Sequence, residues 1–298
     1  MSALDWGDRV GVTYSIKRKI VQVVAFGYSN MHLVNFNGGK IYKGKWKQFC
    51  NPGLNCYSCP AASFACPIGA LQAVNGSMDF NFSFYVVGLL LAFGVVFGRG
   101  VCGWLCPFGL LQEFIHKVPS PKLKLKKGFL YIKYVILVIF VILLPIVATN
   151  YMGMGKPAFC QFICPAGTLQ GGIPLLSTHE ELRETIGSLF SLKMAILILT
   201  IAGCILVYRF FCRVICPLGA IYGLMNKVSI YHLEVNKHQC VNCGKCKNVC
   251  KMEVDPVKQK DSAECIRCKA CVAACPNKAI QISFDTKPAF FGKKKNKI

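Results

Sequence analysis

The sequence predicts a mainly α-helical membrane protein that carries a small α+β domain near its carboxy-terminal end. Of the 298 residues, 54% are hydrophobic and only 16% are charged, which is too apolar for an ordinary soluble enzyme. Short cysteine-proline motifs recur beside the apolar segments, and a denser set of cysteines follows residue 239. We expect four transmembrane helices, arranged as two repeated halves, and then a cysteine-rich domain.

Four segments have about the length that a spanning helix needs. They are residues 20–36, 80–98, 129–149 and 189–211. The second segment has no charge, and the third is interrupted only by Lys133. The fourth contains Lys193 and Arg209 near its ends, where long side chains can reach the interface. The first segment is the weakest, because glutamine, asparagine and histidine interrupt it, but it lacks the clean apolar run of a cleaved signal peptide, so we expect a retained helix.

The distribution of basic residues predicts the orientation of these helices. Lysine and arginine are frequent in the amino-terminal tail, in the link between the second and third segments, and in the carboxy-terminal part. With four spans these three pieces lie on one side, so we expect a multi-pass protein of the cell (inner) membrane with both termini in the cytoplasm. Four lysines in the loop of residues 37–79 weaken this argument, whereas three glutamates in the second outer loop agree with it.

The cysteine spacing near the carboxy terminus is typical of a bacterial two-cluster ferredoxin. Each of two runs has the pattern C-x2-C-x2-C-x3-C, and in such pairs the fourth cysteine of one run ligates the cluster of the other. Zinc sites instead use pairs of C-x2-C separated by a long gap. One [4Fe–4S] cluster is therefore assigned to Cys240, Cys243, Cys246 and Cys275, and the other to Cys265, Cys268, Cys271 and Cys250.

The predicted domain bounds follow from these assignments. A membrane domain covers residues 1–228, the two-cluster ferredoxin-like domain covers residues 229–285, and a basic tail covers residues 286–298.

The motif Cys-Pro-x-Gly occurs four times beside the apolar segments. The copies read CPIGALQ from Cys66, CPFGLLQ from Cys106, CPAGTLQ from Cys164 and CPLGAIY from Cys216. Proline suits the first position of a helix, so each cysteine is expected at a helix N-terminus, where the helix dipole stabilises a thiolate. Three copies have a second cysteine four residues earlier, namely Cys102, Cys160 and Cys212. Each pair then supplies half of a site with four thiolates.

The predicted topology combines these halves into two further clusters. The inner-face set is Cys102, Cys106, Cys212 and Cys216. The outer-face set is Cys59, Cys66, Cys160 and Cys164, in which Cys56 could replace Cys59.

Simpler explanations remain open for the cysteines of the membrane domain. Each CPxG motif could be only a helix start with a buried free cysteine beside it, and the outer cysteines could form disulfides. For Cys50 and Cys56 the disulfide and the metal-ligand interpretations are equally supported. Cys204 stands among apolar residues of the fourth segment and is expected to be a small apolar residue only.

The formal net charge of +22 does not point to nucleic acid, because the basic residues are not interleaved with aromatic ones. Clusters with four thiolates carry negative charge and would offset part of the excess. No glycine-rich phosphate-binding loop is present, so we expect no NAD or nucleotide site in this chain.

The segments CGWLCPFG from Cys102 and CRVICPLGAIYG from Cys212, with the double ferredoxin run, resemble the NapH/NosR-type membrane polyferredoxins over roughly residues 80–285. These proteins serve periplasmic nitrate reductase, nitrous-oxide reductase and related systems. The resemblance implies iron–sulfur ligation by the four inner cysteines and the eight ferredoxin cysteines, and electron transfer between the quinol pool or the cytoplasm and an extracytoplasmic acceptor. The additional outer cysteines depart from the family pattern, and we expect no fused extracytoplasmic flavin domain.

We therefore expect a membrane-bound iron–sulfur protein that passes electrons across the membrane, as the electron-transfer subunit of an oxidoreductase complex. The expected partners are lipid, an extracytoplasmic flavin or haem protein, a cytoplasmic ferredoxin-like or flavoprotein donor, and quinol. Quinol oxidation would need a proton acceptor, for which Glu113, His116 and His32 are candidates more readily explained as surface residues. We assign no catalytic residues.

Two alternative functions remain. Exposed Cys50 and Cys56, with Met78, could bind a soft metal such as copper in an oxidase-maturation factor, or the outer cysteines could act as a redox sensor.

Overall fold

The computed structural model describes residues 3–76, 83–148, 155–184 and 186–284, so the predicted basic tail lies outside the described residues. The mainly helical class is confirmed, with one two-stranded sheet among the described residues. The chain forms two compact units that both combine distant segments. The first unit contains residues 3–20, 91–104 and 221–284, and the second contains residues 21–90 and 105–220. The predicted domain bounds at residues 228 and 285 remain predictions.

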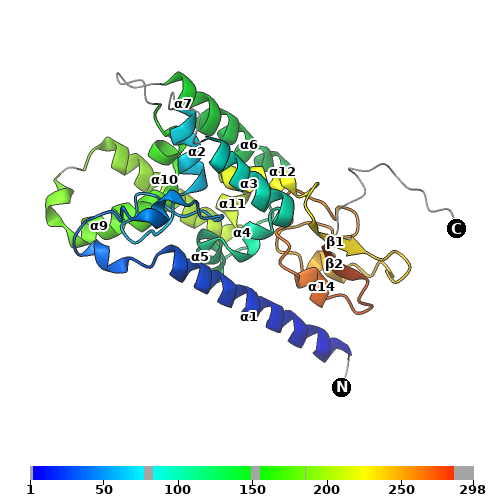
Figure 1. The fold of residues 1–298 in the computed structure, drawn as a ribbon. Helices are drawn as coiled ribbons and strands as arrows, with labels where there is room; N and C mark the ends of the chain where they lie inside the picture. Colours follow the sequence, from blue (N-terminus) through cyan, green and yellow to red (C-terminus); the bar gives the residue numbers. More distant parts are fainter. Residues whose placement is uncertain (1–2, 77–82, 149–154, 185, 285–298) are drawn as a thin grey trace. The chain divides into compact units, whose positions relative to one another are not determined.

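The first unit is built around the two-stranded antiparallel sheet of β1 and β2 (Figure 1). Tyr231 pairs with Phe284 and Val235 with Ile280, so the apolar side chains of both strands share one face. Leu233, Ile280 and Cys246 form its buried core. The elements that lie wholly in this unit are α4 (Gly100–Trp104), β1 (Tyr231–Val235), α13 (Lys245–Asn248), α14 (Ala270–Ala273) and β2 (Ile280–Phe284).

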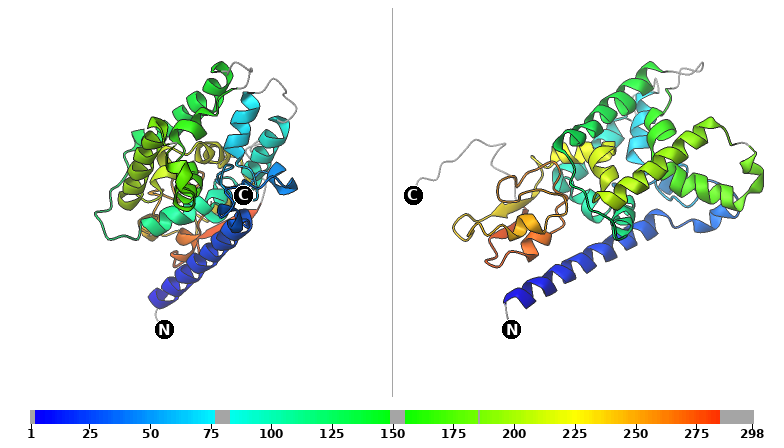
Figure 2. Two further views of the ribbon diagram at one scale, coloured as in Figure 1. Left: turned by 90° about the vertical axis from the view of Figure 1, so that its left-hand side faces the viewer. Right: turned by 180° about the vertical axis from the view of Figure 1, so that it is seen from behind.

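The second unit is helical. Helix α10 packs on α5, α8 and α11, and α2 packs on α7 and η5. Figure 2 shows the chain turning back at η8 between α9 and α10. The elements of this unit are η1 (Leu33–Phe36), η2 (Lys45–Gln48), α2 (Pro67–Asn75), α5 (Pro107–Ile115), η4 (Lys127–Tyr131), α6 (Ile132–Ile136), η5 (Leu137–Leu143), α7 (Leu144–Val147), η6 (Phe159–Ile163), α8 (Pro165–Gly167), η7 (Thr168–Gly172), α9 (Ile173–Thr178), η8 (Glu180–Arg183), α10 (Ser188–Leu206) and α11 (Phe210–Val214). Three helices contribute to both units: α1 (Ala3–Ser29), α3 (Ser83–Phe97) and α12 (Pro217–Met225).

Two helical stretches among the described residues are long and apolar enough to cross a membrane. They are Lys127–Val147, formed by η4 to α7, and Ser188–Leu206, which is α10. Only 22% and 17% of these segments is buried, so most of their apolar side chains face outward and need an apolar surrounding. Helix α3 is apolar but shorter. The count of four spans and the two-half repeat remain predictions.

The first predicted span is wrong in its bounds. Instead of one helix over residues 20–36, α1 runs from Ala3 to Ser29 and the chain then leaves the helix. The side chains of Ser29 and Asn30 donate to carbonyls of the last turn, at 2.6 Å to Ala25 O and 3.1 Å to Phe26 O. The backbone beyond them pairs with another loop, because His32 N donates to Ala61 O at 3.2 Å. Polar side chains therefore end this helix.

The fourth predicted span ends five residues early, at Leu206. Arg209 follows in a left-handed backbone conformation (φ 53°) and begins the separate helix α11. We expected Arg209 to extend toward the membrane surface, but its side chain is fully buried and ion-paired with Glu113. A buried guanidinium needs a carboxylate partner, and Arg209 meets Glu113 at the break between α10 and α11.

Candidate functional site

Every CPxG motif begins a helix at its proline, as predicted. The helices α2, α5, α8 and α12 start at Pro67, Pro107, Pro165 and Pro217, directly after a motif cysteine. The freed N–H groups of the first turn point at the sulfur that precedes them. The thiol of Cys66 accepts hydrogen bonds from the backbone of Gly69 and Ile68, and the thiol of Cys164 accepts them from Gly167 and Ala166. The motif is therefore a backbone cradle for a negatively charged sulfur.

Four thiols of the second unit gather at the starts of α2 and α8. These are Cys56, Cys66, Cys160 and Cys164, and every pair among them interacts electrostatically. Burial raises the pKa of the Cys66 thiol to about 11 and that of the Cys164 thiol to about 12, since a charge is costly away from water. Such thiols ionise when a cation binds them.

The sequence favoured Cys59 in this set, with Cys56 as the alternative, and in the structure Cys56 is the one that interacts with Cys66, Cys160 and Cys164. The Cys59 thiol donates to the carbonyl oxygen of Gln170 at 3.1 Å and also interacts electrostatically with Cys56. Lys47 lies beside both: its ammonium is buried, donates to Ala62 O at 2.8 Å, and sits 4.8 Å from the centre of the Tyr57 ring. A buried positive charge therefore lies beside Cys56.

Cys50 does not fit the expectation of an exposed metal ligand. It is buried, and its backbone forms a bridge with Ala65. Cys56 is half-buried, and Met78 lies outside the described residues. All 19 cysteines are described, and none forms a disulfide.

Three of the four cysteines predicted for the inner-face set lie in this unit: Cys106 and Cys216 at the starts of α5 and α12, and Cys212 within α11. All three are at most 4% exposed, and the thiols of Cys106 and Cys212 interact electrostatically. Burial and this interaction raise the pKa of the Cys106 thiol, while N–H groups of Leu54 and Gly109 lower it. Cys102, the fourth predicted member, lies on α4 in the first unit.

The segment of residues 50–55 links these two groups. It is buried along its length although we expected an outer loop. At Gly53 an added Cβ would lie 2.9 Å from the Cα of Cys106, so only glycine allows the backbones this close. Leu54 N–H reaches the Cys106 sulfur, and Cys56 of the other group follows two residues later. Two residues span at most about 7 Å of chain.

The three candidates for a proton acceptor have other partners. Glu113 is buried and accepts a hydrogen bond from Arg209 Nε at 2.9 Å and another from its Nη2. The Nδ1 atom of His116 lies 3.0 Å from Cys204 O. His32 stacks on Tyr42 with ring centres 3.9 Å apart. The explanation of Glu113 as a surface residue is therefore wrong.

The ferredoxin-like part contains two cavities, each lined by four cysteines. The first is lined by Cys240, Cys243, Cys246 and Cys275, and the second by Cys250, Cys265, Cys268 and Cys271. In both, three cysteines come from one run and the fourth from the other. Left-handed residues bend each run at matching places: Asn242 and Gly244 in the first, Arg267 and Lys269 in the second. These bends turn three closely spaced cysteines toward one centre.

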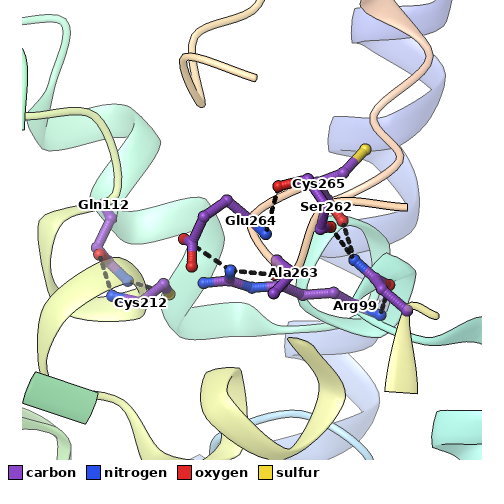
Figure 3. Close-up of polar contacts among 8 residues, drawn as sticks. Arg99, Gln112, Cys212, Ser262, Ala263, Glu264 and Cys265 are labelled. Atoms are coloured by element: carbon purple, nitrogen blue, oxygen red, sulfur yellow. Dashed lines mark hydrogen bonds and ion pairs between the residues drawn. The ribbon is translucent and has the colours of Figure 1, made fainter. Parts of the chain in front are cut away.

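The loop of the second cavity is attached to helix α4, which carries Cys102. Arg99 is fully buried and donates through Nη1 to Ala263 O at 2.6 Å and to Glu264 Oε2 at 2.8 Å (Figure 3). Trp104 Nε1 donates to Arg267 O at 3.1 Å. At Gly103 a Cβ would lie 2.3 Å from Ile266 O. Gly103, which follows Cys102, therefore contacts Ile266, which follows Cys265.

Asn226 completes this attachment. Its side-chain amide donates to Ser262 O at 2.9 Å and to Cys265 O at 2.8 Å, while its Oδ1 accepts from Arg99 N at 2.8 Å. The carbonyl of a cavity cysteine is thereby held by the residue that directly follows α12.

The donor chemistry of these groups fits [4Fe–4S] clusters, which cysteine thiolates hold. The thiols surround cavities or gather beside N–H donors, the environment that tunes a thiolate-bound cluster. The sequence interpretation missed two residues in these groups, Gln72 and Gln112, although glutamine recurs at the same place in three motif copies.

Two family models match the chain, both described as 4Fe–4S binding domains. One matches residues 80–126, 134–180 and 191–233, which contain three of the CPxG motifs, and the other matches residues 258–281. No solved structure is detectably similar to the chain.

Several proteins have similar sequences. An uncharacterized protein of Methanocaldococcus jannaschii is 29% identical over 206 residues, which is 66% of this chain and 76% of that protein. The putative electron transport protein YccM of Escherichia coli is 26% identical over 70% of this chain and 56% of its own length. Protein NirI of Paracoccus denitrificans is 30% identical over 63% of this chain but only 26% of its own length. NosR and the ferredoxin-type protein NapH are also similar to the chain. With the cysteine groups described above, these similarities show that the chain belongs to the NapH/NosR-type polyferredoxin family.

Proposed function

We propose that this iron–sulfur electron-transfer protein conducts electrons across a membrane, between a cytoplasmic donor or the quinol pool and an extracytoplasmic redox partner. Four [4Fe–4S] clusters would supply the one-electron chemistry. The observation that carries the proposal is that cysteines gather in each unit at sites that have short links of chain or close backbone contact beside them. The two outward-facing apolar helices support a membrane location, and we propose that both termini are cytoplasmic.

The first link in this series lies within the ferredoxin-like part. Cys250 follows Cys246 by four residues and Cys275 follows Cys271 by four, yet each lines the other cavity. We assign the first cluster to Cys240, Cys243, Cys246 and Cys275, and the second to Cys250, Cys265, Cys268 and Cys271. Each run thus supplies one cysteine to the cavity of the other run, which keeps the two centres close.

The second link is the contact of Gly103 with Ile266, which joins the loop of the second cavity to the helix of Cys102. From the sequence we assign the third cluster to Cys102, Cys106, Cys212 and Cys216. The buried anchors Arg99 and Asn226 hold this link in place without mobile surface loops.

The third link is the buried segment of residues 50–55, which reaches from Cys106 toward Cys56. We assign the fourth cluster to Cys56, Cys66, Cys160 and Cys164. A bilayer core is about 30 Å thick. Two groups on opposite faces would be too far apart for one transfer step, and this segment supports a shorter separation. Irregular backbone at such a depth is tolerated because protein covers it.

Iron analysis tests the number of clusters and the assignment of Cys56. Full-length protein, purified anaerobically in detergent, should contain about sixteen irons with matching acid-labile sulfide. Replacing Cys160 and Cys164 should lower the content to about twelve, and so should Cys56→Ser. Cys59→Ser is the matched control, because it removes a neighbouring thiol that bonds to a carbonyl, and it should leave the iron content unchanged.

If Cys59→Ser lost about four irons and Cys56→Ser kept all of them, Cys59 would be the ligand instead of Cys56. An iron content of about twelve in the wild-type protein would refute the outer cluster, and the proposed path across the membrane with it.

A further inference from the structure

A glutamine follows the CPxG motif in three of its four copies, and it has no role in the cysteine assignments. It stands six residues after the motif cysteine, as Gln72, Gln112 and Gln170, and the fourth copy has Tyr222 there. Six helical residues rise about 9 Å. The side chain therefore cannot return to its own cysteine, and a buried amide at this position must serve another part of the protein.

The structure gives Gln72 and Gln112 the same set of contacts. Gln72 is fully buried; its Nε2 donates to the Cys160 sulfur at 3.2 Å and to Ile68 O at 3.2 Å, and its Oε1 accepts from Phe159 N at 2.9 Å. Gln112 is 1% exposed; its Nε2 donates to the Cys212 sulfur at 3.0 Å, the contact drawn in Figure 3, and to Phe108 O at 3.3 Å, and its Oε1 accepts from Cys212 N at 3.4 Å.

The partners determine which way each amide faces. A backbone N–H can only donate, so Oε1 faces the N–H of the opposite segment, and a carbonyl can only accept, so it takes one hydrogen of the amide nitrogen. The second hydrogen is then directed at the sulfur. Near Gln112 the thiol of Cys204 lies 3.6 Å from the same Oε1, which supports this orientation. Every donor and acceptor of both amides is used, as a buried polar group requires.

The glutamines connect the two halves of each cysteine group. Gln72 of the first motif reaches the first cysteine of the third half-site, and Gln112 of the second motif reaches the first cysteine of the fourth. In the first group a contact also runs in the opposite direction, from the third motif back to the first half-site: Gln170 Oε1 accepts from Cys56 N at 2.9 Å. This is the same pairing of motifs by which the cysteines form two groups.

We propose that Gln72 and Gln112 are positioning residues that each donate an amide hydrogen bond to one cluster-bound cysteine sulfur and thereby raise the reduction potential of that cluster. Their action rests on the proposed function, since it requires clusters at both groups. Hydrogen bonds to cluster sulfurs contribute to the reduction potential. An N–H donor stabilises the more negative, reduced state more than the oxidised one, so removing it lowers the potential.

The test compares Gln72→Met, Gln112→Met and Gln22→Met in the full-length protein by EPR-monitored redox titration. Methionine keeps the length and burial of glutamine without its amide. Gln22 is the matched control, because it is also fully buried and makes no bond to a sulfur. Gln112→Met should shift the midpoint of the inner cluster to more negative potential, and Gln72→Met that of the outer cluster only. Gln22→Met should shift neither.

An unchanged midpoint in a variant that keeps all its iron would overturn the proposal. Should a variant lose its cluster, pulsed EPR on wild-type protein with 15N-labelled glutamine side chains decides, since an amide on a ligand sulfur must give a 15N coupling. Absence of that coupling at the inner cluster would also overturn the proposal. A wild-type content of about twelve irons would refute the outer cluster instead, and the Gln112 comparison would still stand.

Discussion

The buried pair of Glu113 and Arg209 offers a sharp test of the structure of the second unit. The guanidinium is fully buried and the carboxylate is 8% exposed, with Nε to Oε1 at 2.9 Å. Glu113→Gln keeps the shape but removes the negative charge that Arg209 needs. Breaking such a pair by changing one partner costs about 3–5 kcal/mol. At about 2–4 °C per kcal/mol for a protein of this size class, the unfolding midpoint should fall by roughly 10 °C.

The assay is thermal unfolding of detergent-purified protein, followed as the monodisperse fraction after heating, at one scan rate because unfolding of such proteins is often irreversible. Glu180→Gln is the control: it removes the charge from an exposed pair with Arg183, 3.4 Å apart, and should change the midpoint by about 1–2 °C at most. The double variant Glu113→Leu with Arg209→Met should recover part of the loss in stability, since it removes both buried charges of this pair. Equal shifts for Glu113→Gln and Glu180→Gln would refute the buried pair.

Two further predictions concern the close backbone contact at α4 and the buried thiols. Gly103→Ala should destabilise the protein by about 1–3 kcal/mol and slow electron exchange between the ferredoxin-like part and the inner cluster, because the new Cβ would lie 2.3 Å from Ile266 O. Gly88→Ala, in a helix with open space around it, should be neutral or stabilising, and equal thermal midpoints for the two variants would contradict the contact. In cluster-free protein at pH 8, iodoacetamide should label exposed Cys243 and spare Cys66, whose pKa of about 11 leaves the reactive thiolate scarce until the pH approaches that value. Mass spectrometry measures both sites across pH, and equal labelling at pH 8 would contradict the raised pKa.

Features that depend on neighbouring residues could be predicted from the sequence. Proline after each motif cysteine marks a helix start, because its fixed φ and missing N–H suit only that position, and all four helices begin there. The sequence also predicted that Cys250 lines the second ferredoxin cavity and Cys275 the first, since the close spacing of the cysteines in a run restricts which centre each can reach.

Other features depend on segments far apart in the sequence, and these the pattern misjudged. The polar residues near Asn30 marked the weakest predicted span, but spacing could not show that the helix ends there and that the backbone then pairs with the loop near Ala61. Spacing also could not show that the Cys59 thiol meets the carbonyl of Gln170, more than 100 residues away.

The sequence by itself determined the helix starts, the ferredoxin spacing and the number of thiols, because each follows from local geometry and ligand chemistry. Only the tertiary structure decided that residues 50–55 run buried from Cys106 toward the outer group, that Arg209 and Glu113 neutralise each other, and that the motif glutamines reach across to the opposite half-site. The physical reason is that a buried polar or charged group must find its partner wherever the fold offers one, and that partner is chosen by packing in three dimensions rather than by spacing along the chain.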